Sequence, residues 1–263
     1  MDQALFKQMC DAFLVQSKRL LASEPYAYTL SGSIGKGTAD GRSDYDFRLY
    51  YEKAVEPAAF YRILGEIGEL VREWTGRGFV VDSVWPRSIS EIDEGLDRWL
   101  SGQGALVPLE WTVWGYNLLT DIYNQKILDD PFGIAQRWKD RLTPYPDVVR
   151  KTILDRCVSS LRYWRGDYHY RNKVDRGDLP FLASLTARLV NDVLQALFAL
   201  NRVYYPGDGS NLVLSRHLAI RPGRLEERVE AILYPENGAL GIGRQYADLL
   251  ALIDETLALA EQA

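Results

Sequence analysis

Residues 32–38 of this chain read GSIGKGT, and residues 43–46 read SDYD. The segment before them, residues 26–30, is aromatic and β-branched and predicts a strand, and the acidic motif opens a second strand. Side chains alternate along a strand, so Asp44 and Asp46 are expected on one face, with Cα atoms ~7 Å apart. Two carboxylates that face a glycine-rich turn with backbone N–H groups can hold Mg²⁺ against a triphosphate. This stretch therefore predicts both a β-sheet and a site that can bind Mg²⁺ and a triphosphate.

The pattern around this stretch predicts an α+β protein. Apolar residues recur with a helical period over residues 2–22 and 57–74, and residues 79–84 predict a third strand. Residues 104–114 predict a fourth, edge-like strand, because Pro108 is poorly tolerated in a central one. The remaining segments favour helices: 116–126, 132–142, 146–166, 179–204, 210–219, 224–233 and 239–261. We therefore expect a small mixed sheet with flanking helices over residues 1–115 and an all-helical bundle over residues 116–263.

Composition limits the classes of function. The chain has 263 residues, of which 47% are hydrophobic and 25% charged, as in ordinary globular proteins. A net charge of −5 argues against a broad nucleic-acid surface. No run of 18 apolar residues occurs, and the first 20 residues are amphipathic and contain acids, so we expect a cytoplasmic protein without a membrane span. Two cysteines and two histidines argue against a disulfide framework and a His-rich zinc site.

Two common phosphate-binding motifs do not fit the glycine-rich segment. A P-loop requires Gly-Lys followed by Ser or Thr, but Lys36 is followed by Gly37, and the position of the first glycine is Leu30. A dinucleotide-binding fingerprint that starts at Gly35 requires a small residue at position 40, which is Asp40. Both motifs are therefore excluded.

A third acid completes a different pattern. Asp82 lies within the apolar segment FVVDSVW, residues 79–85, where an unpaired buried carboxylate would cost several kcal/mol unless a metal or a partner satisfied it. A Gly-Ser turn, an Asp-x-Asp strand and a later strand acid, in this order, resemble the nucleotidyltransferase superfamily that includes DNA polymerase β and the antibiotic-modifying nucleotidyltransferases. The resemblance covers roughly residues 26–84.

The resemblance implies a role for each residue of the pattern. Two Mg²⁺ ions would be bound by the catalytic carboxylates, which are Asp44, Asp46 and Asp82. The third acid, Asp82, is either a ligand of the catalytic metal or the base that takes the substrate proton. The nucleotide-binding residues would be Gly32, Ser33, Lys36, Arg42 and Ser43, with the turn at Gly32 and Ser33 holding the β- and γ-phosphates. Lys36 and Arg42 would neutralise the triphosphate, or they are exposed loop charges.

The activity implied is transfer of a nucleoside monophosphate, AMP from ATP or the equivalent from another NTP, to a hydroxyl of a small molecule, with release of pyrophosphate. Aminoglycoside- and lincosamide-type antibiotic resistance enzymes are the nearest analogy in size and layout. One alternative is a transferase that modifies a protein, as in toxin–antitoxin pairs. Another is an inactive nucleotide-binding regulatory module, against which the three aspartates count. The sequence specifies neither the acceptor nor the oligomeric state.

Several polar and aromatic residues outside this pattern have two interpretations. Glu110 and Asp121 could bind a cationic or polyhydroxy acceptor, with Trp111 and Trp114 stacking on it, although aromatic residues of this kind more often belong to a core. Arg48 would share the strand face of Asp46 and either contact the substrate or serve as a structural counter-charge.

Overall fold

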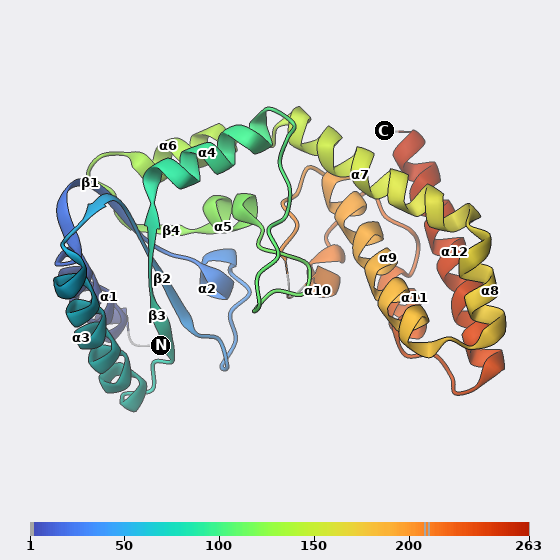
Figure 1. Cartoon of the computed structure of the whole chain (residues 1–263), viewed down its shortest axis with the longest axis horizontal. Helices are drawn as coiled ribbons and strands as arrows, with labels where there is room; N and C mark the ends of the chain where they lie inside the picture. The colour runs from blue at the N-terminus through green and yellow to red at the C-terminus, as the bar shows by residue number, and fades with distance from the viewer. Residues whose placement is uncertain (1–2, 208, 210, 263) are drawn as a thin grey trace. The chain divides into compact units, whose positions relative to one another are not determined.

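The computed structural model describes residues 3–207, 209 and 211–262, and its architecture is α+β (Figure 1). The strands are β1 (Leu21–Leu30), β2 (Tyr45–Ala54), β3 (Val81–Ser88) and β4 (Lys126–Asp129). They form one mixed sheet in the order β3-β2-β1-β4. β2 is antiparallel to β1 and parallel to β3, and β1 is antiparallel to β4. The first three strands overlap the segments that the sequence predicts, but β1 begins earlier, at Leu21 within the predicted first helix, and β3 continues to Ser88.

The fourth strand is not the predicted one. Residues 104–114 are irregular and contribute one isolated bridge, between Val107 and Tyr116, whereas β4 comes from Lys126–Asp129. β4 is only four residues long and pairs with the end of β1. Its sequence, KILD, has too few residues to show a period, so its strand conformation depends on the edge that β1 offers.

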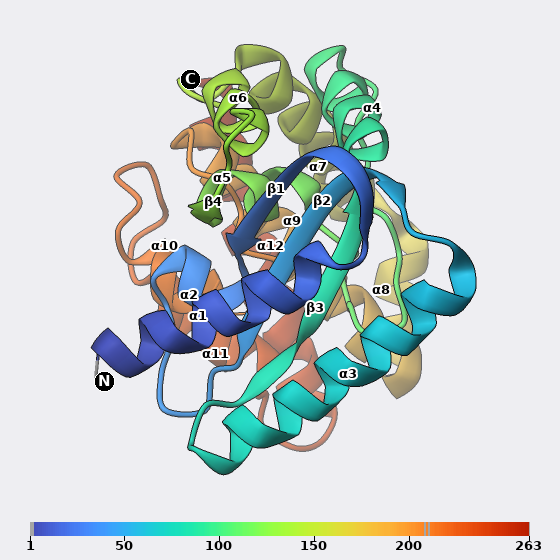
Figure 2. The same cartoon turned by 90° about the vertical axis from the view of Figure 1, so that its left-hand side faces the viewer.

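The two faces of β2 have different partners. Phe47 faces α1 and stacks on Phe13 at 5.0 Å between ring centroids. Tyr50 faces the other way, and its ring meets Trp138 edge-on at 4.8 Å. Figure 2 shows α1 and α3 crossing in front of the sheet on the first of these faces. The alternation of side chains along β2 therefore gives one apolar face for the core and one face for polar residues.

The helices of the chain include α4 and α8, which lie outside the helical segments that the sequence predicts. Their bounds are α1 (Gln3–Lys18), α2 (Gly32–Lys36), α3 (Pro57–Gly76), α4 (Ile89–Leu100), α5 (Leu118–Asn124), α6 (Ile134–Arg141), α7 (Asp147–Gly166), α8 (Tyr168–Arg176), α9 (Leu179–Leu200), α10 (Asn211–Ser215), α11 (Leu225–Leu233) and α12 (Ala239–Glu261). Local capping explains several ends. Glu56 accepts a hydrogen bond from the backbone N–H of Ala59 at the start of α3, where Pro57 occupies a position that needs no N–H donor.

The chain divides into two compact units. One unit combines Met1–Arg98 with Leu118–Pro144, and the other combines Trp99–Asn117 with Tyr145–Ala263. This division differs from the predicted boundary between residues 115 and 116, because α5, β4 and α6 belong to the unit that contains the sheet. β4 pairs with β1, and α6 packs against the same strand, so both elements are held by the sheet.

The second unit is helical, and α9 forms the centre of its core. Every residue of α9 from Leu189 to Leu200 is buried. Two polar side chains in this stretch are paired with α7: Asp192 accepts a hydrogen bond from Ser160, and Gln195 accepts one from Arg156. By length and composition α9 is apolar enough to cross a membrane, a property that buried core helices share. In this structure its apolar surface is covered by the helices of its own unit.

Candidate active site

Gly32 and Asp46 are in direct contact at the centre of the predicted site. Gly32 begins α2 with φ +62°, and a Cβ atom placed on it would lie 1.8 Å from Asp46 Oδ2. The backbone also joins the two segments, because the Ser31 N–H donates to the Asp46 carbonyl oxygen at 2.9 Å. Only glycine fits this position, both for its left-handed conformation and for the space it leaves to the carboxylate. The structure thus brings together the turn and the acid that the sequence associates.

The turn itself is tightly packed. A Cβ on Gly35 would lie 3.2 Å from the carbonyl oxygens of Leu30 and Asn124, so α2 sits against the end of β1 and the end of α5. The hydroxyl oxygen of Ser33 is buried, and among the described residues it has no hydrogen-bond partner. An unsatisfied buried hydroxyl costs free energy unless a ligand supplies its partner. Ser33 therefore has the property expected of a ligand-binding residue.

Asp46 is surrounded by three other carboxyl groups within electrostatic range: those of Asp44, Asp82 and Asp121. Burial raises the pKa of Asp46 from 3.8 to about 6, the cation of Arg48 opposes this shift, and the three carboxylates add to it. Repulsion of this kind is costly in the free protein and is relieved by a bound cation or a proton. The site is therefore prepared for a positive charge.

Arg48 lies between two of these acids, Asp46 and Asp121. Its side chain is 8% exposed, with Nη1 3.6 Å from Asp46 Oδ1 and Nε 3.4 Å from Asp121 Oδ2. Asp121 comes from α5, 73 residues further along the chain. This contact supports the interpretation of Arg48 as a counter-charge and gives Asp121 a partner inside its own unit.

A second buried polar group supports α5 behind this pair. Gln125 Oε1 accepts hydrogen bonds from Thr29 Oγ1 at 2.8 Å and from Tyr50 OH at 2.9 Å. Lys139 Nζ donates to the carbonyl oxygens of Tyr123 and Gln125 at the end of α5. These bonds fix the helix that carries Asp121. No local sequence pattern indicates the role of Gln125. A buried arginine on a strand signals only that a carboxylate must lie nearby.

Asp82 is not the buried, unpaired carboxylate that its apolar context suggests. It is exposed, and it accepts a hydrogen bond from Trp85 Nε1 at 2.8 Å. The ladder between β2 and β3 skips it, since Tyr45 pairs with Val81 and Asp46 with Ser83. A bulge of this kind places an extra residue outside the regular alternation and re-aims its side chain. Asp82 nevertheless remains within electrostatic range of Asp46.

The remaining predicted nucleotide-binding residues lie around the turn. Lys36 ends α2 and is half-buried, and Arg42 is an exposed turn residue. The Ser43 hydroxyl belongs to a local turn, because it accepts a hydrogen bond from the Asp40 N–H and donates to Asp40 Oδ1. Asp40 also accepts from the Arg42 N–H, which is an Asx-turn. Ser43 therefore shapes the loop that leads into Asp44.

The candidate acceptor-binding residues are divided between the two units. Glu110, Trp111 and Trp114 belong to the helical unit, whereas Asp121 belongs to the unit with the sheet. Trp111 is 60% exposed and is not a core residue. The expectation of core packing is therefore wrong for Trp111.

The donor set at Asp46 fits Mg²⁺ only with the help of a substrate. Among the described residues no three His, Cys, Asp or Glu side chains form a compact metal-binding group. Mg²⁺ commonly takes one or two protein carboxylates and completes its octahedron with phosphate oxygens and water. Asp44 and Asp46, which lie within electrostatic range of each other, match such a partial ligand set.

The Arg48 pairing gives a test of site integrity. We expect Arg48→Met to lower the free energy of unfolding by about 3 kcal/mol, because the Asp46 and Asp121 carboxylates lose their buried counter-charge. The control is Lys151→Met, which removes an exposed ion pair with Asp155 and should change stability by less than ~1 kcal/mol. Urea unfolding of both variants measures the difference. Equal effects would mean that Arg48 is not a buried counter-charge.

Part of the chain matches the model of a known family. A family described as a domain of unknown function (DUF4037) matches residues 111–209, which include Asp121 and all of α9 and follow all of the residues from Gly32 to Asp82. No curated protein matches the sequence of this chain.

Proposed function

We propose that this protein is a Mg²⁺-dependent nucleotidyltransferase that transfers a nucleoside monophosphate, AMP from ATP, to a hydroxyl of a small molecule and releases pyrophosphate. The observation that carries the proposal is the contact between Gly32 and Asp46, which leaves a carboxylate oxygen facing a glycine turn in the space that a Cβ would fill. The buried, unpartnered hydroxyl of Ser33 in the same turn supports it. The four neighbouring carboxyl groups supply the negative charge that attracts a divalent metal ion.

Each residue of the site has its own role in the proposed reaction. Asp44 and Asp46 would hold Mg²⁺, which when bound stabilises the charge on the attacking and leaving oxygens. The Ser33 hydroxyl and the first N–H groups of α2 would donate hydrogen bonds to phosphate oxygens. Arg48, whose Nη1 lies 3.6 Å from Asp46 Oδ1, would hold the Asp46 carboxylate in place beside Gly32.

The transfer itself requires a proton acceptor. The acceptor hydroxyl oxygen bonds to the α-phosphorus, the bond from that phosphorus to the bridging oxygen breaks, and pyrophosphate leaves. We assign the hydroxyl proton to Asp82, because its carboxylate is exposed beside the site and one of its oxygens is held by Trp85 Nε1. A carboxylate with one oxygen held and the other open can accept a proton without reorganising.

Pyrophosphate release from NTPs tests the proposal directly. The purified protein is incubated with Mg²⁺, each of the four NTPs and a panel of hydroxyl-bearing acceptors, including aminoglycosides and lincosamides. Release that depends on Mg²⁺ and on one acceptor would support the proposed activity. Labelling of a co-expressed protein from ATP, without turnover of any small acceptor, would support the protein-modifying alternative. The absence of both, with no NTP binding, would contradict the proposal.

The raised pKa of Asp46 predicts the acid limb of the pH profile. Because this group is half-protonated near pH 6 in the metal-free protein, binding of Mg²⁺ should weaken about tenfold per pH unit below 6 and be insensitive to this group above 7. Calorimetric titration of Mg²⁺ with nucleotide between pH 5 and 8 measures this dependence. A midpoint near pH 4 would show that Asp46 has an ordinary pKa and is not desolvated.

A further inference from the structure

The helical unit contains a cavity of its own, with a volume of about 650 Å³. It is formed by residues of α9, α10 and α11, by Tyr205 after α9, and by Trp114 of the segment Trp99–Asn117. All of these residues belong to one compact unit. Sites that bind drug-sized molecules typically have volumes of ~300–1,000 Å³. The cavity is therefore large enough for a ligand and is distinct from the residues around Asp46.

The walls of the cavity are mostly apolar. Val190 and Leu194 of α9 and Val229 of α11 line it and are at the same time members of the buried core of the unit. Trp114 and Leu233 add a half-buried aromatic and a partly exposed aliphatic wall. A surface of this kind favours an apolar body, at ~25 cal/mol for each Å² removed from water.

Two asparagines provide polar groups at fixed positions. Asn191 is 7% exposed, and its Oδ1 accepts a hydrogen bond from Tyr205 OH at 2.6 Å, so its amide N–H groups are the donors that it presents. Asn211 Nδ2 donates to the Gly207 carbonyl oxygen at 2.5 Å, and its Oδ1 is buried with no hydrogen-bond partner among the described residues. The lining therefore offers one amide donor and one amide acceptor.

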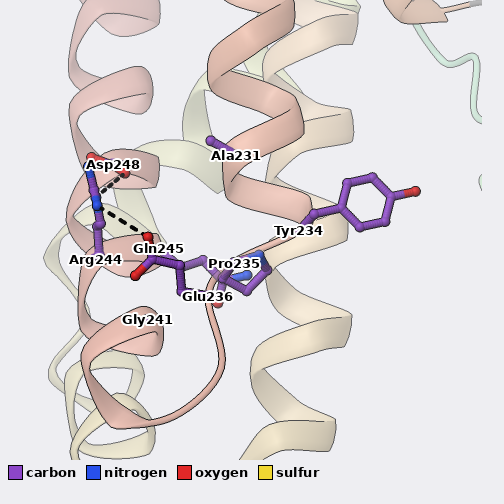
Figure 3. A pocket seen from close by; sticks show the side chains of 8 residues that line it. All are labelled: Ala231, Tyr234, Pro235, Glu236, Gly241, Arg244, Gln245 and Asp248. Atoms are coloured by element: carbon purple, nitrogen blue, oxygen red, sulfur yellow. Dashed lines mark ion pairs between the residues drawn. The ribbon is translucent and has the colours of Figure 1, made fainter.

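The two cavities of the helical unit differ in the charge of their lining residues. Within the described part of the chain, no lining residue of the larger cavity is Asp, Glu, Lys or Arg. The smaller cavity, of about 250 Å³, is lined by Arg244 with its ion-pair partners Glu236 and Asp248 at 3.7 and 3.9 Å (Figure 3). Tyr234 lines both cavities, and Figure 3 shows its ring pointing away from these charged side chains.

We propose that the larger cavity binds a neutral small molecule that has an apolar ring-sized body and a hydroxyl or N–H group at one edge. The body would lie against α9 and α11, and the polar edge would donate to Asn211 Oδ1 and accept from the Asn191 amide. A cationic or anionic ligand would lose its hydration there without finding a counter-charge among the described lining residues. This site does not depend on the proposed nucleotidyl transfer.

Four naphthalenes that share one ring body test the proposal by calorimetric titration of the full chain. 2-Naphthol should bind saturably, and 2-methoxynaphthalene, which lacks the donor, should bind about fivefold more weakly because one hydrogen bond is lost. 2-Naphthoate and 2-naphthylmethylammonium should bind at least ~10-fold more weakly than 2-naphthol because a charge must be desolvated. Equal affinities for all four, or no saturable binding of 2-naphthol, would overturn the proposal.

Three variants locate the binding site. Ala187→Phe fills the cavity from a half-buried position on α9 and should abolish 2-naphthol binding. Asn211→Leu should remove the preference for 2-naphthol over the methoxy compound and retain binding of the ring. Arg244→Gln, in the smaller cavity, should bind like the wild type. Unchanged affinity in Ala187→Phe with an unchanged melting temperature would place the probe elsewhere and overturn the assignment.

Asp46→Asn should bind 2-naphthol normally, so failure of the proposed transferase and failure of this site are distinguishable.

Discussion

Replacement of Asp46 with asparagine is expected to lower the rate of pyrophosphate release by about 10³-fold, equivalent to ~4 kcal/mol of transition-state stabilisation. The amide keeps the shape of the side chain beside Gly32 but supplies no negative charge to a metal ion. Turnover at saturating Mg²⁺ and ATP, compared with wild type, measures the loss. The control is Asp11→Asn, which removes an exposed charge of α1 and should leave the rate unchanged. Equal turnover in Asp46→Asn and wild type would refute the assignment of the site.

The same variant should be more stable than the wild type in the absence of Mg²⁺. Because the folded-state pKa of Asp46 is raised above its ordinary value of 3.8 to about 6, ionisation of this group destabilises the fold as pH rises through that range. At pH 7 ionisation of Asp46 lowers the free energy of unfolding by up to about 3 kcal/mol, and Asp46→Asn should restore much of this stability. The gain should disappear towards pH 4, where the wild-type carboxyl is protonated in the folded and increasingly in the unfolded state. Thermal unfolding at pH 4 and pH 7 with chelator present measures the difference.

The second large effect is expected from Gly32→Ala. The added Cβ would lie 1.8 Å from Asp46 Oδ2, so the carboxylate must move or the turn must open, and we expect turnover to fall by at least ~10²-fold. Gly37→Ala is a matched control, because Gly37 has a similar φ of +74° but no atom within 4 Å of an added Cβ. Both variants bear the strain of a left-handed alanine, of order 1–2 kcal/mol, and only Gly32→Ala displaces the acid.

Steady-state kinetics and thermal unfolding of both glycine variants separate the two contributions. Similar losses of stability with a loss of turnover in Gly32→Ala alone would show that the contact with Asp46 matters for activity. If Gly37→Ala lost as much turnover as Gly32→Ala, the effect would come from the conformation of the turn, and the contact would not explain it.

Local sequence patterns predict the elements around the candidate site well. Residues 26–30, 44–51 and 79–84 correspond to β1, β2 and β3, since each combines β-branched or aromatic residues with turn residues at its ends. The failure at residues 104–114 has a physical cause. The segment GALVPLEWTVW has strand-forming residues, but strand conformation also needs a partner edge, and among the described residues this segment forms only the isolated bridge between Val107 and Tyr116.

The local sequence pattern also fails to predict the environment of the Asp82 side chain. Its neighbours in sequence are apolar, and a regular strand would bury it or its neighbours alternately. A bulge opposite Tyr45 and Asp46 interrupts that alternation, and the Trp85 side chain turns back to donate to the carboxylate. Neither feature leaves a mark in the local pattern, because a bulge is defined by the register of two strands.

The opening stretch of sequence determined which residues meet at the centre of the site. A glycine followed by serine after one strand, and an aspartate on the next, are joined by local chain geometry, and the structure brings Gly32 and Asp46 into contact. Only the tertiary structure decided how the negative charge of Asp46 is compensated. Arg48 meets Asp121 across 73 residues, and Gln125 fixes α5 through β1 and β2. Such pairings depend on which helix covers the polar face of the sheet, and that choice is made by the packing of the whole unit, since a buried arginine specifies the need for a carboxylate but not its position in the chain.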